Sequence, residues 1–190
     1  MIKRLTTALF EVFSAFILLF GQNAFGETMD KAAFWEIIED AKSASSNSYG
    51  RPDALRAALE KLSPDEIQGF QEAYIAQVYE AYTWPLWGAA YVMNGGCSDD
   101  CFDYFRDWLI SEGQSVYKAA VENPETLAEL EGADEFELEE FRYVADEVYE
   151  AKTGRAMKPN YPEFPGDPSG EPWDEDAVDK LFPKLADKYW

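Results

Sequence analysis

The amino-acid sequence predicts an all-α fold, a compact single domain of about seven or eight helices. Apolar residues recur three and four positions apart along most of the chain, and no segment alternates with the two-residue period of a β-strand. The clearest helix start is formed by Ser63, Pro64 and Glu66, because serine caps, proline suits the first turn and glutamate closes a capping box. With 190 residues, 47% of them hydrophobic, the chain can bury one substantial core.

The predicted helical core spans residues 29–153, and its first part contains three helices with one apolar face each. Their expected ranges are about residues 31–44, 52–62 and 64–83. Asp30 and Ser63 are suited to cap the first and the third helix, and Pro52 to occupy the first position of the second. On the third helix, Glu72 and Glu80 fall outside the apolar stripe, so we expect both to face solvent.

Residues 84–110 are the centre of the predicted fold, because they contain three of the six tryptophans and both cysteines. Residues 84–93 carry little charge, which predicts a short helix that is buried on most sides. Gly95 and the glycine after it can end this helix in the left-handed conformation. Ser98 or Cys97 then caps the next helix, which ends near Gly113.

The C-terminal part of the chain combines further helices with a proline-rich segment. We expect helices over about residues 114–122, 125–130 and 134–152, the last of them long and amphipathic. Prolines recur through residues 154–172 and exclude regular helix or central strand, so this segment should run extended and packed on the core. Residues 173–190 then predict a short C-terminal helix of the same domain.

Residues 1–28 are excluded from the predicted fold under either of two interpretations. They resemble a secretory signal, with a basic start at Lys3 and Arg4 followed by a short apolar run, which would predict an exported protein. Alternatively, translation starts at Met29, where the first helix opens, and the residues before it are compatible with a purine-rich ribosome-binding sequence. We favour this mistaken start, which predicts a cytoplasmic protein.

The composition excludes several classes of function. The chain has 37 acidic and 16 basic residues, a net charge of −21, so we expect no binding to nucleic acid or membranes. It has no histidine, which removes Ser-His-Asp and Cys-His catalysis and histidine-ligated metal sites. We therefore expect no cofactor, no metal and no catalytic residues, and the partner that the charge favours is a basic protein.

One group of residues could still bind a ligand or catalyse a reaction. It combines the acidic start of the helix after Ser98 with the aromatic residues that precede the turn. The candidate ligand-binding residues are Trp84, Trp87, Tyr91, Asp99, Asp100, Asp103 and Arg106. Asp99, Asp103 and Asp107 share one helix face, where carboxylates can hold a cation or work as acid and base. The structural alternative, which we favour, is a solvated acidic face that suits the helix dipole, with the aromatic rings buried as core.

Cys97 and Cys101 also have two interpretations. Their spacing does not match the Cys-x-x-Cys redox motif, and without a histidine partner we interpret them as small buried side chains. If residues 1–26 are a genuine signal peptide, a disulfide between them becomes available, although its loop is too short to add much stability.

Several runs of the sequence carry a resemblance to a known family. They are FW at residues 34–35, WPLWGAAY at 84–91, NGGCSDD at 94–100, FDYFRDWLI at 102–110, NPETLA at 123–128, YEAKTG at 149–154 and PWDED at 172–176. In these runs the chain resembles a bacterial family, domain of unknown function 4240, over about residues 29–190. Members typically begin at the equivalent of Met29, so the resemblance implies a cytoplasmic protein, and it implies no activity and no catalytic residues.

Two functional hypotheses follow from the sequence. The first is a non-enzymatic acidic interaction protein, a regulator or an immunity-type inhibitor, that binds a basic protein partner. The alternative is a small-molecule or cation-binding protein, or an enzyme, that uses the Asp/Arg cluster of residues 99–106 beside Trp84 and Trp87. DNA mimicry by the acidic surface is a third, weaker hypothesis.

Overall fold

The computed structural model of the chain describes residues 29–131 and 135–190. Within these ranges it contains nine α-helices, three short 3-10 helices and no β-strand, which confirms the all-α prediction. The helices outnumber the predicted ones in part because residues 173–190 contain two short helices instead of one. Both interpretations of residues 1–28 concern a segment that lies outside the described residues.

The helices lie close to their predicted ranges in the first two thirds of the chain. The α-helices are α1 (Lys31–Ser43), α2 (Arg51–Leu59), α3 (Pro64–Glu80), α4 (Trp84–Asn94), α5 (Asp99–Ser111), α6 (Gln114–Glu122), α7 (Val144–Thr153), α8 (Val178–Leu181) and α9 (Pro183–Tyr189). The 3-10 helices are η1 (Ser48–Gly50), η2 (Pro124–Glu129) and η3 (Glu139–Tyr143).

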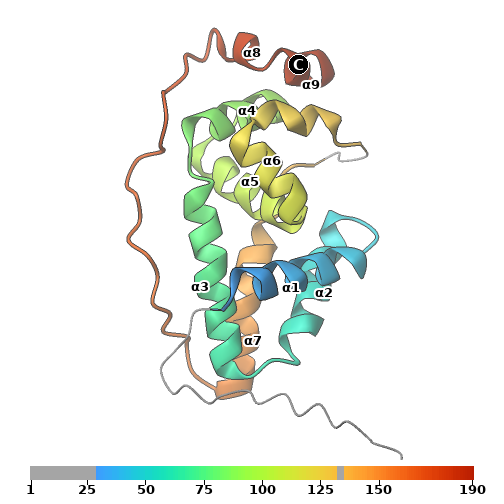
Figure 1. Cartoon of the computed structure of the whole chain (residues 1–190), viewed down its shortest axis with the longest axis vertical. Coiled ribbons are helices and arrows are strands. Elements are labelled where there is room, and N and C mark those ends of the chain that lie inside the picture. The colour runs from blue at the N-terminus through green and yellow to red at the C-terminus, as the bar shows by residue number, and fades with distance from the viewer. Residues whose placement is uncertain (1–28, 132–134) are drawn as a thin grey trace, which may run out of the picture.

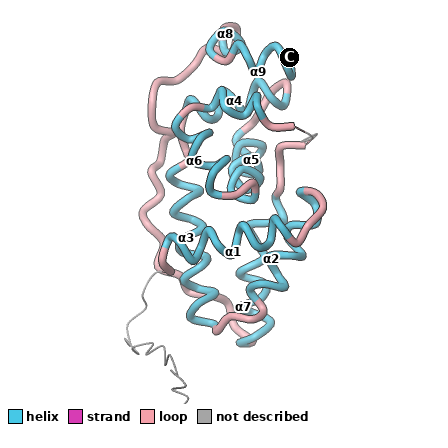
Figure 2. The backbone as a smooth tube through the Cα atoms, turned by 45° about the vertical axis from the view of Figure 1, so that its right-hand side comes forward, coloured by secondary structure: helices cyan, strands magenta, loops and turns pink. Residues whose placement is uncertain are grey.

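The helices form two groups that share one core. α3 and α7 pack against each other in one half of the molecule, together with the pair α1 and α2 (Figure 1). α4, α5 and α6 make up the other half, and α8 and α9 cover α4 at its outer end (Figure 1 and Figure 2). α5 connects the two halves, since it contacts α1, α3 and η3 as well as α4 and α6.

The local signals around α3, α4 and α5 act as the sequence predicts. Ser63 and Glu66 form the capping box of α3, in which each side chain accepts a hydrogen bond from the other residue's backbone N–H. Gly95 ends α4 in the left-handed conformation, at φ 66°. The Ser98 hydroxyl accepts a hydrogen bond from the Cys101 N–H at 3.2 Å and so caps α5.

The chain before α7 corrects one prediction, because residues 134–152 do not form one long helix. Phe136 and Leu138 are both buried, while Glu137 between them is exposed. An α-helix cannot produce this two-residue alternation, and Leu138 instead donates its N–H to the Tyr104 carbonyl at 3.0 Å. The chain then passes through η3, and α7 begins only after it.

The proline-rich segment, residues 154–172, is an extended strap that runs along the outer side of α3 and joins α7 to α8 (Figure 1). Near its start, the Asn160 N–H donates to Glu72 Oε1 at 2.7 Å. Near its end, Ser169 makes two backbone hydrogen bonds with the turn between α3 and α4. Glu72 is buried, so the prediction that it faces solvent is wrong, because the sequence of α3 alone does not reveal the covering strap.

The C-terminal segment docks on α4 at Gly88. Phe182 and Trp173 lie directly over this glycine, and the Trp173 indole N–H donates to the Trp84 carbonyl at 2.9 Å. Because glycine has no Cβ atom, both rings can approach the helix backbone closely.

This close approach predicts that Gly88→Ala weakens the docking. A Cβ atom here would lie 2.7 Å from Phe182 Cε2 and 3.0 Å from Trp173 Cδ1, so the rings would have to move. We expect urea denaturation to show a loss of about 1–3 kcal/mol in the free energy of unfolding. In a Phe182→Ala background, which lacks the nearer ring, the loss should be clearly smaller. An equal loss in both backgrounds would contradict this packing.

Candidate functional site

A cavity of about 360 Å³ lies between α3, α5, the η3–α7 segment and the strap. Small-molecule sites in proteins have volumes of roughly 300–1,000 Å³, so this cavity is of suitable size. Its charged residues are Asp103, Arg106, Asp107, Arg142 and Asp146. Its aromatic residues are Tyr74, Tyr79, Tyr143, Tyr161 and Phe164.

The centre of the site is Asp107, a carboxylate with no exposed surface. The Tyr74 hydroxyl of α3 donates to Asp107 Oδ1 at 2.5 Å. Arg142 Nε of η3 donates to Asp107 Oδ2 at 2.6 Å. The sequence placed Asp107 on a solvated face, and this prediction is wrong, because α3 and η3 both pack over that side of α5.

Asp103, one turn before Asp107, joins the two arginines of the site. Arg142 Nη1 donates to Asp103 Oδ2 at 3.3 Å, and Arg106 Nη2 donates to Asp103 Oδ1. The Arg106 guanidinium is buried and also donates to the carbonyls of Val78, at 2.9 Å, and Phe102, at 3.3 Å. These contacts satisfy a charged group that would be costly to bury without partners.

Burial sets the electrostatics of this network. It raises the pKa of Asp107 to about 7, although the ion pair with Arg142 and the hydrogen bond from Tyr74 act in the opposite direction. Burial also lowers the pKa of Arg106, an effect that the two aspartates partly offset. For Arg142, the neighbouring Asp107 more than reverses the effect of burial, so its pKa lies above the ordinary value. Perturbed groups of this kind cluster at functional sites.

Only two of the residues that the sequence proposed for ligand binding, Asp103 and Arg106, line this cavity. Asp99 and Asp100 are exposed in the first turn of α5, where the helix dipole favours acids. The aromatic candidates Trp84, Trp87 and Tyr91 do not belong to the cavity lining.

Trp84 and Tyr91 instead pack under the C-terminal segment, and Trp87 stacks on Trp84 and on Phe102. Trp84 stacks on Trp87 with their ring centres 5.4 Å apart, and its ring meets Trp173 edge to face. Tyr91 packs against Trp173 at 5.0 Å and donates its hydroxyl to Glu175. Trp173 and Glu175 lie more than 80 positions later than the rings they contact, so local sequence could not show that Trp84 and Tyr91 are covered.

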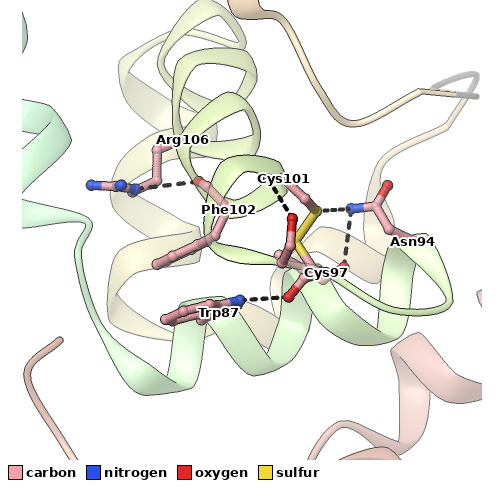
Figure 3. The surroundings of a disulfide bond; sticks show 8 residues. Trp87, Asn94, Cys97, Cys101, Phe102 and Arg106 are labelled. Carbon is pink, nitrogen blue, oxygen red and sulfur yellow. Dashed lines mark hydrogen bonds between the residues drawn. A yellow bond between two sulfur atoms is a disulfide. The ribbon is translucent and has the colours of Figure 1, made fainter.

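A disulfide joins Cys97, in the turn between α4 and α5, to Cys101 in the first turn of α5, with their Cα atoms 5.2 Å apart (Figure 3). Our interpretation of them as small buried side chains is wrong, because both are partly exposed, and the disulfide is the alternative that the sequence left open. The Trp87 indole N–H donates to the Cys97 carbonyl at 3.0 Å (Figure 3). Trp87 also stacks on Phe102, whose ring lies 4.9 Å from the Arg106 guanidinium, so the turn is coupled to the cavity.

The sequence missed most of the cavity residues. Tyr74 is indistinguishable from the other apolar-stripe residues of α3, and Arg142 and Asp146 lie in the segment that the sequence assigned to one continuous helix. Tyr161 and Phe164 are aromatic residues between prolines, which is the one local signal that the strap packs on the domain.

No group of three or more Cys, Asp or Glu side chains among the described residues is placed to hold a metal ion. None of the helices within residues 29–131 and 135–190 is long and apolar enough to cross a membrane.

The chain belongs to the family described as protein of unknown function (DUF4240), whose model matches residues 29–151. The match includes α3, α5 and Arg142, and it ends before the strap. No curated protein and no solved structure matches the chain.

The raised pKa of Asp107 predicts a specific pH dependence of stability. A carboxyl whose pKa rises from 3.8 to about 7 on folding stabilises the protein when protonated. This contribution is complete below about pH 4 and is lost as the pH rises to about 7. Asp107→Asn does not titrate, so the free energy of unfolding of the wild type, relative to this variant, should fall over that range, by at most about 1.4 kcal/mol per pH unit.

Urea denaturation at a series of pH values measures this difference. The control variant is Asp187→Asn, which removes one carboxylate from the exposed side of α9. A relative stability that rises with pH would show that Arg142 outweighs burial and lowers the pKa of Asp107.

Proposed function

We propose that this chain is a small-molecule-binding protein whose site is the cavity between α3, α5, α7 and the strap. One observation carries the proposal: charged and aromatic side chains from four separate segments meet in one hollow around a fully buried carboxylate. A pocket with a few convergent polar groups and a strongly shifted pKa is the usual form of such a site. This favours the alternative of our two hypotheses, with its residues shifted toward η3 and the strap.

Binding is better supported than catalysis by the same contacts. Asp107 has no exposed surface, and both of its oxygens accept hydrogen bonds, so it is not free to exchange a proton with a ligand. In the proposal, Asp107 and Tyr74 are positioning residues that hold Arg142 in one orientation at the cavity wall. A cavity whose walls are fixed in this way can bind a ligand at little cost in conformational entropy.

A cavity-filling substitution tests the proposal. Ile75 of α3 lines the cavity and is only partly buried, so Ile75→Trp should fill it without disturbing the core. We expect a thermal-shift screen of amines, amino acids, carboxylic acids and nucleosides to yield a compound that stabilises the wild type but not Ile75→Trp. At a concentration of 100 times Kd the stabilisation should be ~2.7 kcal/mol, which corresponds to roughly 5–10 °C for a domain of this size.

The matched control is Ile37→Trp, because Ile37 is also partly buried but lies on α1, outside the cavity. The compound should stabilise this variant as it does the wild type. Equal stabilisation of Ile75→Trp would place the binding site elsewhere and refute the proposal.

A basic protein partner is the second candidate, and the exposed acids near the cavity favour it. Glu139 and Glu140 are exposed at the start of η3, and Glu139 accepts a hydrogen bond from Tyr143 of the cavity wall. Together with the net charge of −21, such a rim attracts cationic surfaces. A partner retained from native lysate and released by salt would support this candidate, and a salt-insensitive partner would contradict it.

The disulfide supports a proposal on location. Disulfides persist in oxidising compartments and are rare in the cytosol, so the Cys97–Cys101 bond favours the exported alternative over the cytoplasmic prediction. Thiol trapping in intact cells should then leave both cysteines unmodified until a reductant is added. Two free thiols, on a native chain whose mass shows that it begins at Met29, would refute the proposal.

A further inference from the structure

The cavity contains one carboxylate that its own arginines do not neutralise. Arg106 pairs with Asp103, and Arg142 pairs with both Asp103 and Asp107. The ion pairs of the described residues do not include Asp146, although it lines the same cavity. Its one hydrogen-bond contact is with Gln71 Nε2, at 3.5 Å, the outer limit for such a bond.

The 3-10 conformation of η3, which leads directly into α7, explains why Asp146 forms no ion pair with the described residues. Arg142 and Asp146 are four residues apart, and in a continuous α-helix this spacing would place them side by side as an ion pair. Arg142 belongs to the 3-10 helix instead, and its guanidinium is held by the two aspartates of α5. Asp146 follows in the first turn of α7 and is left at the cavity wall.

The surroundings of Asp146 are unfavourable for an isolated negative charge. Partial burial raises the pKa of this carboxyl, because water is removed from it and no cation replaces the water. A positive charge brought beside Asp146 would reverse that effect.

The other walls of the cavity present aromatic rings, which also attract cations. Tyr79 comes from α3, Tyr143 from η3, and Tyr161 and Phe164 from the strap. Tyr161 and Phe164 are 40% and 52% exposed, so part of each ring is accessible to a ligand. A carboxylate together with several aromatic faces is the combination that proteins use for ammonium and guanidinium groups.

We propose that the cavity takes an organic cation, an ammonium or guanidinium group, between Asp146 and the aromatic rings of α3, η3 and the strap. This inference rests on the proposed function and names its ligand class. The cationic group can belong to a free small molecule or to a lysine or arginine side chain of a basic protein. The net charge of −21 favours the approach of either.

Titration calorimetry at low ionic strength tests the inference with choline and its uncharged isostere 3,3-dimethylbutan-1-ol. We expect choline to bind at least about tenfold more tightly than the isostere. Asp146→Asn keeps the shape of the side chain, and it should weaken choline binding about tenfold while leaving the isostere unchanged. Asp187→Asn removes the same charge from α9, outside the cavity, and should change the affinity by less than about twofold.

A second variant keeps the test decisive if Asp146→Asn does not fold. Tyr161→Leu removes a ring from the exposed strap without touching the carboxylate, and it should weaken choline binding by about threefold or more. A short peptide with one central arginine replaces choline in a parallel titration. Tighter binding of the peptide identifies a protein side chain as the source of the cation, and tighter binding of choline identifies a free compound.

Equal binding of choline and its isostere, or choline binding that neither variant weakens, would overturn the inference. The proposed function is judged separately by Ile75→Trp. If that variant abolishes the binding of an anion or a neutral compound, the cavity is a ligand site of another class. If no bound compound is sensitive to Ile75→Trp, both proposals fail.

Discussion

A buried carboxylate, Asp107, is the constraint on which the arrangement of this molecule depends. It lies on α5, and its two hydrogen-bond donors come from other elements, Tyr74 from α3 and Arg142 from η3. Removing a partner from a buried ion pair typically costs about 3–5 kcal/mol, because an uncompensated charge is left behind. Asp107 therefore favours the geometry in which α3, α5 and η3 meet, and the cavity lies where they meet.

Aromatic residues on both sides of the α4–α5 turn pack against this network. Trp84, Trp87 and Phe102 stack nearly parallel, with successive interplanar angles of 7° and 10°. Arg106 lies against the Phe102 ring and reaches Asp103, so the stack continues into the charged network. The disulfide fixes the turn at the other end, where Trp87 is hydrogen-bonded to Cys97. Of the residues that the sequence marked as a site, Asp103 and Arg106 thus belong to the cavity, and Trp84 and Trp87 belong to the aromatic stack beside it.

The closed network and the unpaired Asp146 have different consequences for function. Groups that satisfy one another, such as Asp107, Tyr74 and Arg142, keep the cavity in shape but offer little to a ligand. Asp146 forms no ion pair with the described residues, because Arg142 in η3 is held by the two aspartates of α5, and the rings of the strap keep part of their surface exposed. Recognition is therefore expected on the side of the cavity formed by α7 and the strap.

The sequence by itself determined most of the helices, the caps of α3 and α5 and most of the buried faces, but Asp30, the expected cap of α1, accepts no capping hydrogen bond through its side chain. Signals such as Ser63 with Glu66, or Gly95 after α4, act between residues a few positions apart, and so they can be found without the fold. The prediction of one continuous helix failed at residues 136–138, where buried and exposed residues alternate. Only the tertiary structure decided which charges share a site. Arg142 is 35 residues from Asp107, and no local spacing reveals such a pair, because it exists only once α3, α5 and η3 have packed together.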